Sequence, residues 1–169
     1  VLDRIKAFRL ELNKRDLSGF IVPHADQYQN EYLPACAERL AWLTGFTGSA
    51  GTAVILQDQA SIFIDGRYVL QVRKQVDLQI YKPRHLNEQL LEEWLTSVLK
   101  PGSKLGYDPW LHTPNQVQKL KNSCAKVKAE LVACESNPVD SIWKDRPSIS
   151  LALVVSHDLK YTGKSCARL

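Results

Sequence analysis

The 169-residue sequence predicts an α/β fold, a three-layer sandwich in which helices flank both faces of a mixed β-sheet. Two observations favour this fold. Short apolar runs bounded by turn residues, typical of buried strands, alternate with segments whose apolar residues recur at helical spacing. The connections also differ in kind. One strand pair is joined by three residues and others are joined through helices, which predicts antiparallel and parallel pairing within one sheet.

The first half of the chain is expected to open with a helix, because its apolar residues recur three or four positions apart and Asp3 suits the first turn. The apolar residues of this helix are Leu2, Ile5, Phe8 and Leu12. The elements expected next are a strand over 19–23, a helix from Ala35 to Thr44, a hairpin of strands 52–56 and 60–64, a helix over 68–75 and a strand over 78–81.

The second half contains the clearest helical pattern, residues 86–99, whose leucines, valine and tryptophan form one apolar stripe before Pro101-Gly102. A strand over 104–107 follows. Thr113, Pro114 and Gln116 predict the start of another helix through an N-cap, a proline in the first turn and a capping box. Residues 131–134 are expected to form the last strand, after which the pattern loosens and Pro138 and Pro147 interrupt it.

Composition narrows the classes of partner. The net charge of +4 is mild, and the only basic cluster, Lys119, Lys121, Lys126 and Lys128, has no aromatic residues between its members. We interpret it as a solvated helix face and expect no nucleic-acid partner. No apolar run approaches the roughly 18 residues of a membrane span, so no membrane association is expected. The four cysteines form no C-x-x-C pair, which favours free thiols in the reducing cytoplasm.

The stretch LTGFTGSAGTAVIL, residues 43–56, contains three glycines at a spacing of three: Gly45, Gly48 and Gly51. Phosphate-binding loops have a different spacing, G-x-G-x-x-G or G-x-x-x-x-G-K-[ST], and run from a strand into a helix. Here the order is helix first and strand second, so the helix N-terminus that would hold a phosphate is missing. We therefore interpret the glycines as a structural and interface loop that allows close backbone approach.

Several motifs recur in an order that carries a family resemblance: IVPHADQYQNEYLPAC, RLAWLTGFTGSAGTAVI, FIDGRYVLQVRKQVD, EEWL, LGYDPW, NPVDSIWKDRP and YTGKS. Together they resemble the N-terminal domain of Xaa-Pro aminopeptidases (aminopeptidase P), in the creatinase/prolidase superfamily. The resemblance covers nearly the whole chain and implies a creatinase N-terminal domain-like fold with a ribonuclease H-like motif. It divides the chain into that domain, residues 1–147, and an exit segment, residues 148–169, leading into a second domain.

The resemblance implies an enzyme that removes the N-terminal residue preceding proline, with two manganese ions held in a C-terminal catalytic domain. Paired divalent ions on oxygen ligands would activate water and polarise the scissile carbonyl. The histidines of this chain, His24, His85, His112 and His157, are isolated, and Asp65 has no acidic residue close to it in sequence. We therefore expect no catalytic residue and no metal ligand here, and no hydrolysis by this fragment alone.

Two substrate-binding residues are implied by the resemblance. Arg67 matches the arginine of the D-G-R-Y motif, which implies contact with the peptide substrate; a guanidinium suits a carbonyl or carboxylate. Glu31 matches a family glutamate, although Asn30 stands where relatives have serine. It is expected to orient Arg67 or to support a domain contact. The structural alternatives are an Arg67 ion pair with Asp65 or Glu31, and a Glu31 that faces water.

The expected partners are the C-terminal catalytic domain of the same polypeptide, an Xaa-Pro peptide, and further copies in a homodimer or higher oligomer in the cytoplasm. The alternative function is a peptide- or partner-binding module of a catalytically inactive aminopeptidase-like protein. A ribonuclease H-like nuclease would need carboxylates clustered across strands, and only Asp65 is placed for this. Trp42 is expected in the core, whereas the sequence leaves Trp110 undecided between surface and interior.

Overall fold

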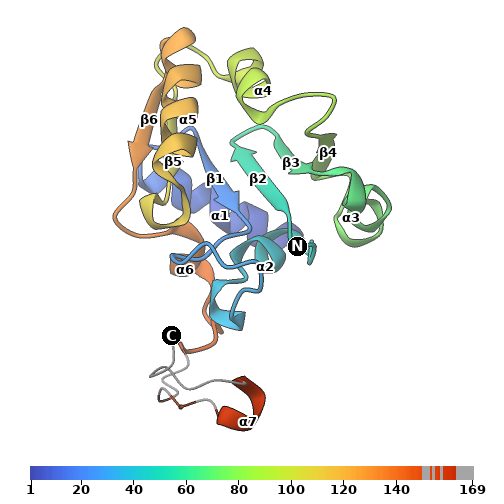
Figure 1. Ribbon diagram of the computed structural model, residues 1–169. Coiled ribbons are helices and arrows are strands. Elements are labelled where there is room, and N and C mark those ends of the chain that lie inside the picture. Colours follow the sequence, from blue (N-terminus) through green and yellow to red (C-terminus); the bar gives the residue numbers. More distant parts are fainter. Residues whose placement is uncertain (150–152, 154, 157, 163–169) are drawn as a thin grey trace.

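A single six-stranded mixed sheet forms the centre of the computed structural model, which describes residues 1–149, 153, 155–156 and 158–162 (Figure 1). The strand order is β4-β3-β2-β1-β5-β6. The strands are β1 (Gly19–Pro23), β2 (Gly51–Leu56), β3 (Ala60–Ile64), β4 (Tyr81–His85), β5 (Lys104–Tyr107) and β6 (Glu130–Ala133). The predicted α/β fold with a mixed sheet is confirmed.

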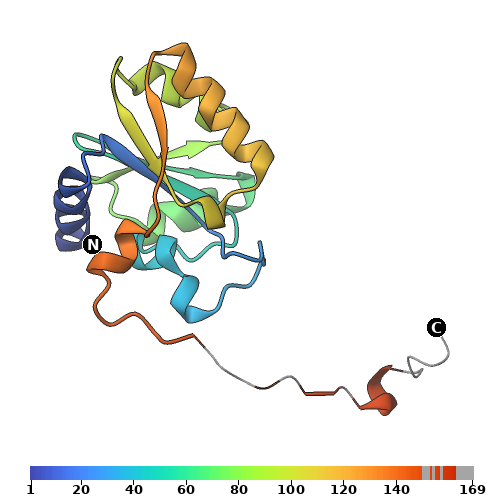
Figure 2. The same ribbon diagram turned by 90° about the vertical axis from the view of Figure 1, so that its left-hand side faces the viewer.

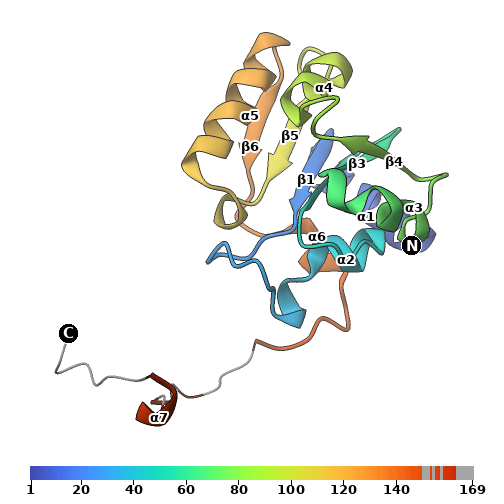
Figure 3. The same cartoon turned by 45° about the vertical axis from the view of Figure 1, so that its right-hand side comes forward.

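Helices cover both faces of this sheet (Figures 2 and 3). The α-helices are α1 (Leu2–Lys14), α2 (Arg39–Thr44), α3 (Val69–Gln75), α4 (Leu91–Val98), α5 (Pro114–Lys126), α6 (Pro138–Ile142) and α7 (Leu159–Thr162). Short 3-10 helices are η1 (Ala35–Ala37), η2 (Gly66–Tyr68) and η3 (Pro109–Leu111). In the described part of the chain, no helix has the length and apolar character needed to span a bilayer.

Two apolar cores separate the three layers. Successive side chains of a strand point to opposite faces, so Phe20 and Val22 of β1 enter one core and Ile21 enters the other. The first core joins the sheet to α1, α2, α3 and α6. The second joins it to α4 and α5, through residues such as Trp94 and Leu120. The predicted three-layer sandwich therefore follows from alternation within each strand.

Strand direction decides where functional groups gather. The middle strand β2 runs antiparallel to β1 and β3, whereas β1 and β5, β3 and β4, and β5 and β6 pair in parallel. Five strands therefore share one direction, and their carboxyl ends lie along one edge of the sheet. In open α/β sheets this edge is where ligands usually bind.

The strongest local signals are confirmed. The hairpin of β2 and β3 forms as expected. The capping box of α5 is present: Thr113 Oγ1 accepts from the Gln116 amide at 3.4 Å, and Gln116 Oε1 accepts from the Thr113 amide at 2.7 Å. The helix over 35–44 is divided into η1 and α2, and a 3-10 turn precedes α3.

The strand predicted over 78–81 is wrong in its position. Residues 77–80 form a turn closed by Asp77, whose carbonyl oxygen accepts from the amides of Ile80 and Tyr81 at 3.0 and 2.9 Å. The strand begins at Tyr81 and continues through Pro83. A proline is tolerated there because β4 is an edge strand and has one neighbour only.

The helix predicted over 86–99 is wrong in its first turn. Helix α4 begins at Leu91, because the preceding backbone continues the sheet: the Leu86 amide donates to the Ile64 carbonyl at 3.1 Å. The amides of Glu88 and Gln89 then donate to the His85 carbonyl in a turn. Leu86 and Leu90 therefore stay partly exposed, and the buried stripe of α4 is carried mainly by Trp94 and Leu95.

Helix α6 is absent from the expectations, which treated Pro138 as an interruption. The structure places Pro138 in the first turn of α6, where its missing amide costs nothing, and Asn137 accepts from the Val139 amide at 3.0 Å. Val139 and Trp143 then enter the first core. Arg146 still donates to the Cys36 carbonyl at 2.7 Å, so contact with the domain extends at least to this residue.

Candidate functional site

The two sequence-predicted site residues lie along the carboxyl edge of the sheet. Arg67 belongs to η2, which directly follows β3. Glu31 belongs to the loop between β1 and η1. Since β1 and β3 run in the same direction, both segments leave the sheet at the same edge.

Arg67 is held by a near neighbour. Asp65 is the N-cap of η2 and accepts from the Arg67 amide at 2.9 Å. The same carboxylate accepts from Arg67 Nε at 3.1 Å and from Nη2 at 2.7 Å. The Arg67 side chain remains 65% exposed. Among the described residues no hydrogen-bond partner faces its Nη1, so part of the guanidinium fork is open to solvent.

This pairing fixes the charges of both groups. Hydrogen bonding from Arg67 lowers the pKa of Asp65 below its usual value. Hydrogen bonding to Asp65, followed by its negative charge, raises the pKa of Arg67, and the negative charge of Glu31 adds a smaller effect in the same direction. Glu31 therefore lies close enough to influence Arg67 electrostatically. Its exposed carboxylate has no hydrogen-bond or ion-pair partner among the described residues, so Arg67 is oriented by Asp65 rather than by Glu31.

Tyr68 joins the D-G-R-Y motif to the glycine-rich loop. Its hydroxyl accepts from the Ser49 amide at 3.2 Å and lies 2.8 Å from Ser49 Oγ. Its ring packs edge-on against Phe46, with centroids 5.5 Å apart, and the Arg67 guanidinium carbon lies 5.2 Å from its centroid. The two motifs, which the sequence presented as separate pieces, therefore form one unit under Arg67.

The glycines of the loop make this unit possible. Gly45 ends α2 in the left-handed region, with a φ of 87°. A Cβ on Gly48 would lie 2.3 Å from Phe46 Cζ and 2.8 Å from Tyr68 Cδ1, and one on Gly51 would lie 2.8 Å from Phe46 Cε1. The loop connects a helix to a strand, as expected, and Gly48 and Gly51 allow close packing of aromatic rings.

The loop that carries Glu31 is held by hydrogen bonds to a buried carboxylate. The buried carboxylate of Asp26 accepts from the amides of Tyr28 and Asn30, both at 3.0 Å, and from Asn30 Nδ2 at 2.8 Å. Burial raises the pKa of Asp26, but these hydrogen bonds outweigh burial and lower it overall. Tyr28 and Tyr32 project from the same loop and are 75% and 86% exposed. The loop thus presents aromatic side chains on a folded support.

Three aspartates follow three parallel strands: Asp26 after β1, Asp65 after β3 and Asp108 after β5. From the sequence only Asp65 was expected at this edge, so Asp26 and Asp108 are additions from the structure. Each carboxylate caps the backbone that follows it, and Asp108 accepts from the Trp110 amide at 3.0 Å. Within the described ranges, no group of three acidic, histidine or cysteine side chains is placed to bind a metal ion.

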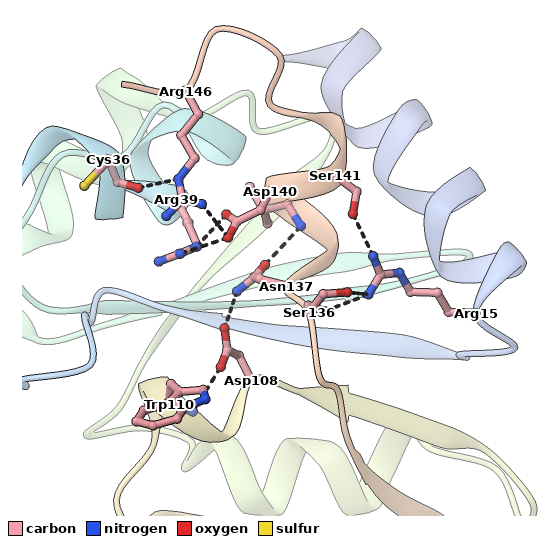
Figure 4. Close-up of polar contacts among 11 residues, drawn as sticks. Arg15, Cys36, Arg39, Asp108, Trp110, Ser136, Asn137, Asp140, Ser141 and Arg146 are labelled. Atoms are coloured by element: carbon pink, nitrogen blue, oxygen red, sulfur yellow. Dashed lines mark hydrogen bonds and ion pairs between the residues drawn. The ribbon is translucent and has the colours of Figure 1, made fainter. Parts of the chain in front are cut away.

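A cleft of about 550 Å³ opens at the carboxyl ends of β5 and β6. Figure 4 shows the polar contacts among residues that line it. Across it, Asp140 accepts from Arg39 at 2.7 and 3.0 Å and pairs with Arg146 at 2.7 Å. Trp110, undecided from sequence, is 74% exposed at this cleft. Trp42 was expected in the core. It is partly buried, packs against the first core and stacks on Trp143, with the ring centroids 5.3 Å apart.

Comparison with known proteins identifies the family. The Creatinase/Prolidase N-terminal domain model matches residues 4–142. The chain is 41% identical over 155 residues to aminopeptidase P2 of Arabidopsis thaliana, covering 89% of this chain and 22% of that protein. It is 36% identical over 166 residues to a probable Xaa-Pro aminopeptidase P of Aspergillus niger, covering 96% and 27%.

A solved structure agrees with the assignment. The X-prolyl aminopeptidase of Caenorhabditis elegans, described as a cytosolic enzyme with a di-nuclear active site, superposes with a TM-score of 0.89 at 27% identity. The match covers 99% of this chain and 29% of that one, so the chain spans about a quarter of the length of these relatives. The chain belongs to the Creatinase/Prolidase N-terminal domain family and corresponds to the N-terminal domain of Xaa-Pro aminopeptidases (aminopeptidase P).

Proposed function

We propose that the chain is the non-catalytic N-terminal domain of a metal-dependent Xaa-Pro aminopeptidase, in which Arg67 contacts the peptide substrate. The observation that supports this role is the geometry of Arg67. One edge of its guanidinium is occupied by Asp65, while Nη1 has no hydrogen-bond partner among the described residues and the side chain as a whole is 65% exposed. The arginine is therefore pre-oriented and still has donors to offer.

A peptide supplies the matching acceptors. Backbone carbonyl oxygens and a C-terminal carboxylate accept hydrogen bonds, and those from a charged donor are stronger than neutral ones. Asp65 reduces the side-chain freedom that Arg67 would lose on binding, which lowers the cost of that contact. Glu31 is the second proposed substrate-binding residue, since its exposed carboxylate could accept from a peptide N–H group near Arg67.

The metal centre belongs, in this proposal, to a C-terminal catalytic domain that binds two manganese ions. The di-nuclear active site described for the Caenorhabditis elegans relative supports this assignment. The N-terminal domain would help to shape the substrate site and a homodimer or higher oligomer, in the cytoplasm. It would supply binding groups to the reaction and no metal ligand.

The test compares the kcat/KM values of variants of the longer polypeptide, using an Xaa-Pro peptide as the substrate. Losing one hydrogen bond from a charged donor costs about 1.5–3 kcal/mol, so Arg67→Ala is expected to lower kcat/KM by roughly 10- to 150-fold. Arg67→Lys is expected to recover little, because an ammonium cannot pair side-on with Asp65 and also present a fork. Arg73→Ala, an exposed arginine on α3, is the matched control. Equal kcat/KM values for Arg67→Ala and Arg73→Ala would refute the substrate contact.

The alternative, a binding module without activity, is separated by a second measurement. The longer polypeptide and the 169-residue chain are each assayed for Xaa-Pro hydrolysis with added Mn(II). Activity in the longer protein and none in the chain is the expected outcome. A longer protein that binds the peptide without cleaving it would favour the binding module, and an active 169-residue chain would contradict both functions.

A further inference from the structure

The cleft beside β5 and β6 has polar groups that are already paired. Asp140 receives Arg39 and Arg146, as described above, and Asp108 Oδ2 accepts from Asn137 Nδ2 at 2.9 Å (Figure 4). The two arginines therefore already have an anionic partner, and the two aspartates already have hydrogen-bond or ion-pair donors. A small charged molecule would have to displace existing partners, so the cleft is poorly suited to such a ligand.

Its apolar groups, by contrast, are uncovered. Trp110 is 74% exposed and Ile149 is 65% exposed, and both line the cleft. By comparison, Trp94 and Trp143 are only 1% and 7% exposed, so the exposed fraction of Trp110 is far higher than that of these two tryptophans. Tryptophan and arginine are enriched in the centres of protein–protein interfaces, and a buried tryptophan often contributes much of the binding energy.

The backbone at Trp110 is also fixed before any contact is made. Pro109 precedes it in η3, and the Asp108 carboxylate accepts from its backbone amide. Asp108 is in turn fixed by Asn137, which caps α6. A large aromatic side chain on a rigid backbone loses little conformational entropy on docking, and burying it removes about 150–250 Å² of surface from water.

The chain itself indicates what covers this surface. After β6 it passes along the cleft, where Arg15 Nη1 donates to the Ser136 carbonyl and Arg15 Nη2 donates to Ser141 Oγ. It leaves the domain at Arg146 and Ile149, which line the same cleft as Trp110. The relatives are about four times as long as this chain, which corresponds to their N-terminal domain, so in them further sequence follows this domain in the same polypeptide. Two domains of one polypeptide meet intramolecularly, so docking between them needs less affinity than docking between separate molecules.

We propose that the exposed pair Trp110 and Ile149 forms a docking surface for the domain that follows this one in the longer polypeptide. The occupant presents an apolar surface to these two side chains and leaves the Arg39–Asp140–Arg146 network intact. This inference rests on the family assignment and on the cleft. It does not depend on whether Arg67 contacts substrate.

The test measures side-chain exposure by hydroxyl-radical footprinting with mass spectrometry, in the 169-residue chain and in the longer polypeptide. Covering a side chain that is 74% exposed is expected to slow modification of Trp110 by roughly five- to tenfold in the longer protein. Leu10, which is 62% exposed on α1, serves as the internal reference. Equal modification of Trp110 in both proteins overturns the proposal. Protection that appears only as concentration rises indicates a second copy, and overturns it as well.

A substitution supplies the second arm. Trp110→Ala is expected to leave the melting temperature of the 169-residue chain unchanged, because the side chain is exposed there, and to lower that of the longer protein by several degrees. Leu10→Ala is the matched exposed control and should change neither. If Trp110→Ala and Leu10→Ala behave alike in the longer protein, the docking surface is refuted. Neither experiment uses substrate, so a failure of the docking proposal can be distinguished from a failure of the Arg67 proposal.

Discussion

Replacing Gly48 by alanine tests whether the glycine-rich loop serves packing. An added Cβ would lie 2.3 Å from Phe46 Cζ, whereas ordinary contact begins at 3.4 Å, so the two groups must separate by about 1.1 Å (3.4 less 2.3). Phe46 is fully buried and cannot swing into solvent. The second close atom, Tyr68 Cδ1 at 2.8 Å, belongs to another ring of the same unit. The strain therefore falls on two rigid side chains at once.

The expected cost combines two effects. Overpacking of a well-packed site costs about 1–3 kcal/mol. Displacing Tyr68 also weakens its hydrogen bonds to Ser49, at about 0.5–1.5 kcal/mol each. We expect Gly48→Ala to lower the free energy of unfolding by about 3 kcal/mol. For a domain of this size that corresponds to a fall in Tm of roughly 6–12 °C.

Gly66→Ala is the matched control from the adjoining motif. A Cβ on Gly66 meets no atom within 4 Å, and its backbone does not require glycine. That variant should be neutral or stabilised by up to about 1 kcal/mol, since alanine restricts the unfolded chain. Urea unfolding followed by circular dichroism gives both values. Unfolding free energies that agree within about 0.5 kcal/mol would refute the packing interpretation of Gly48.

Two further outcomes are expected. Asp140→Ala removes the shared partner of Arg39 and Arg146, and leaving the buried Arg39 unpaired should cost about 3 kcal/mol in urea unfolding; a loss below about 1 kcal/mol would mean that the pair contributes little. Burial lowers the pKa of His112 below its usual 6.5, against the opposing hydrogen bond to the Asp108 carbonyl. The folded state thus disfavours the imidazolium, so this stabilisation is complete above about pH 6.5 and is lost as the pH falls through the lowered pKa. The unfolding free energy should therefore decline between pH 7 and 5 more steeply than in His112→Asn, and parallel pH profiles would contradict the assignment.

Much of the fold could be predicted because its signals are local. The capping box at Thr113 and Gln116 involves residues three positions apart, and the hairpin of β2 and β3 has a three-residue connection. The same reasoning failed where a distant group competed. Leu86 belongs to a helical pattern, yet its amide pairs with Ile64, 22 residues earlier, and the helix starts later. Helix α6 was missed for a different reason, since Asn137-Pro138 carries a local start signal that was taken for an interruption.

The candidate site was less accessible. The resemblance located Arg67 but left its partner open between Asp65 and Glu31. Geometry decides for Asp65, because a carboxylate two positions earlier can cap η2 and pair with the side chain at once. The cleft at the carboxyl ends of β5 and β6 could not be found at all from one sequence, since Arg39 and Asp140 lie 101 positions apart. Pairings of that separation leave no mark on local periodicity.

The glycine-rich stretch and the D-G-R-Y motif form one packed structural unit. Gly48 has no side chain, so Phe46 and Tyr68 can meet edge to edge across the loop. Tyr68 then anchors Ser49 with its hydroxyl and carries Arg67 above its ring. Asp65 holds the guanidinium from the side. A loop that resembles a phosphate-binding loop in composition thus has a packing role, because Gly48 makes room for the aromatic ring on which Arg67 lies.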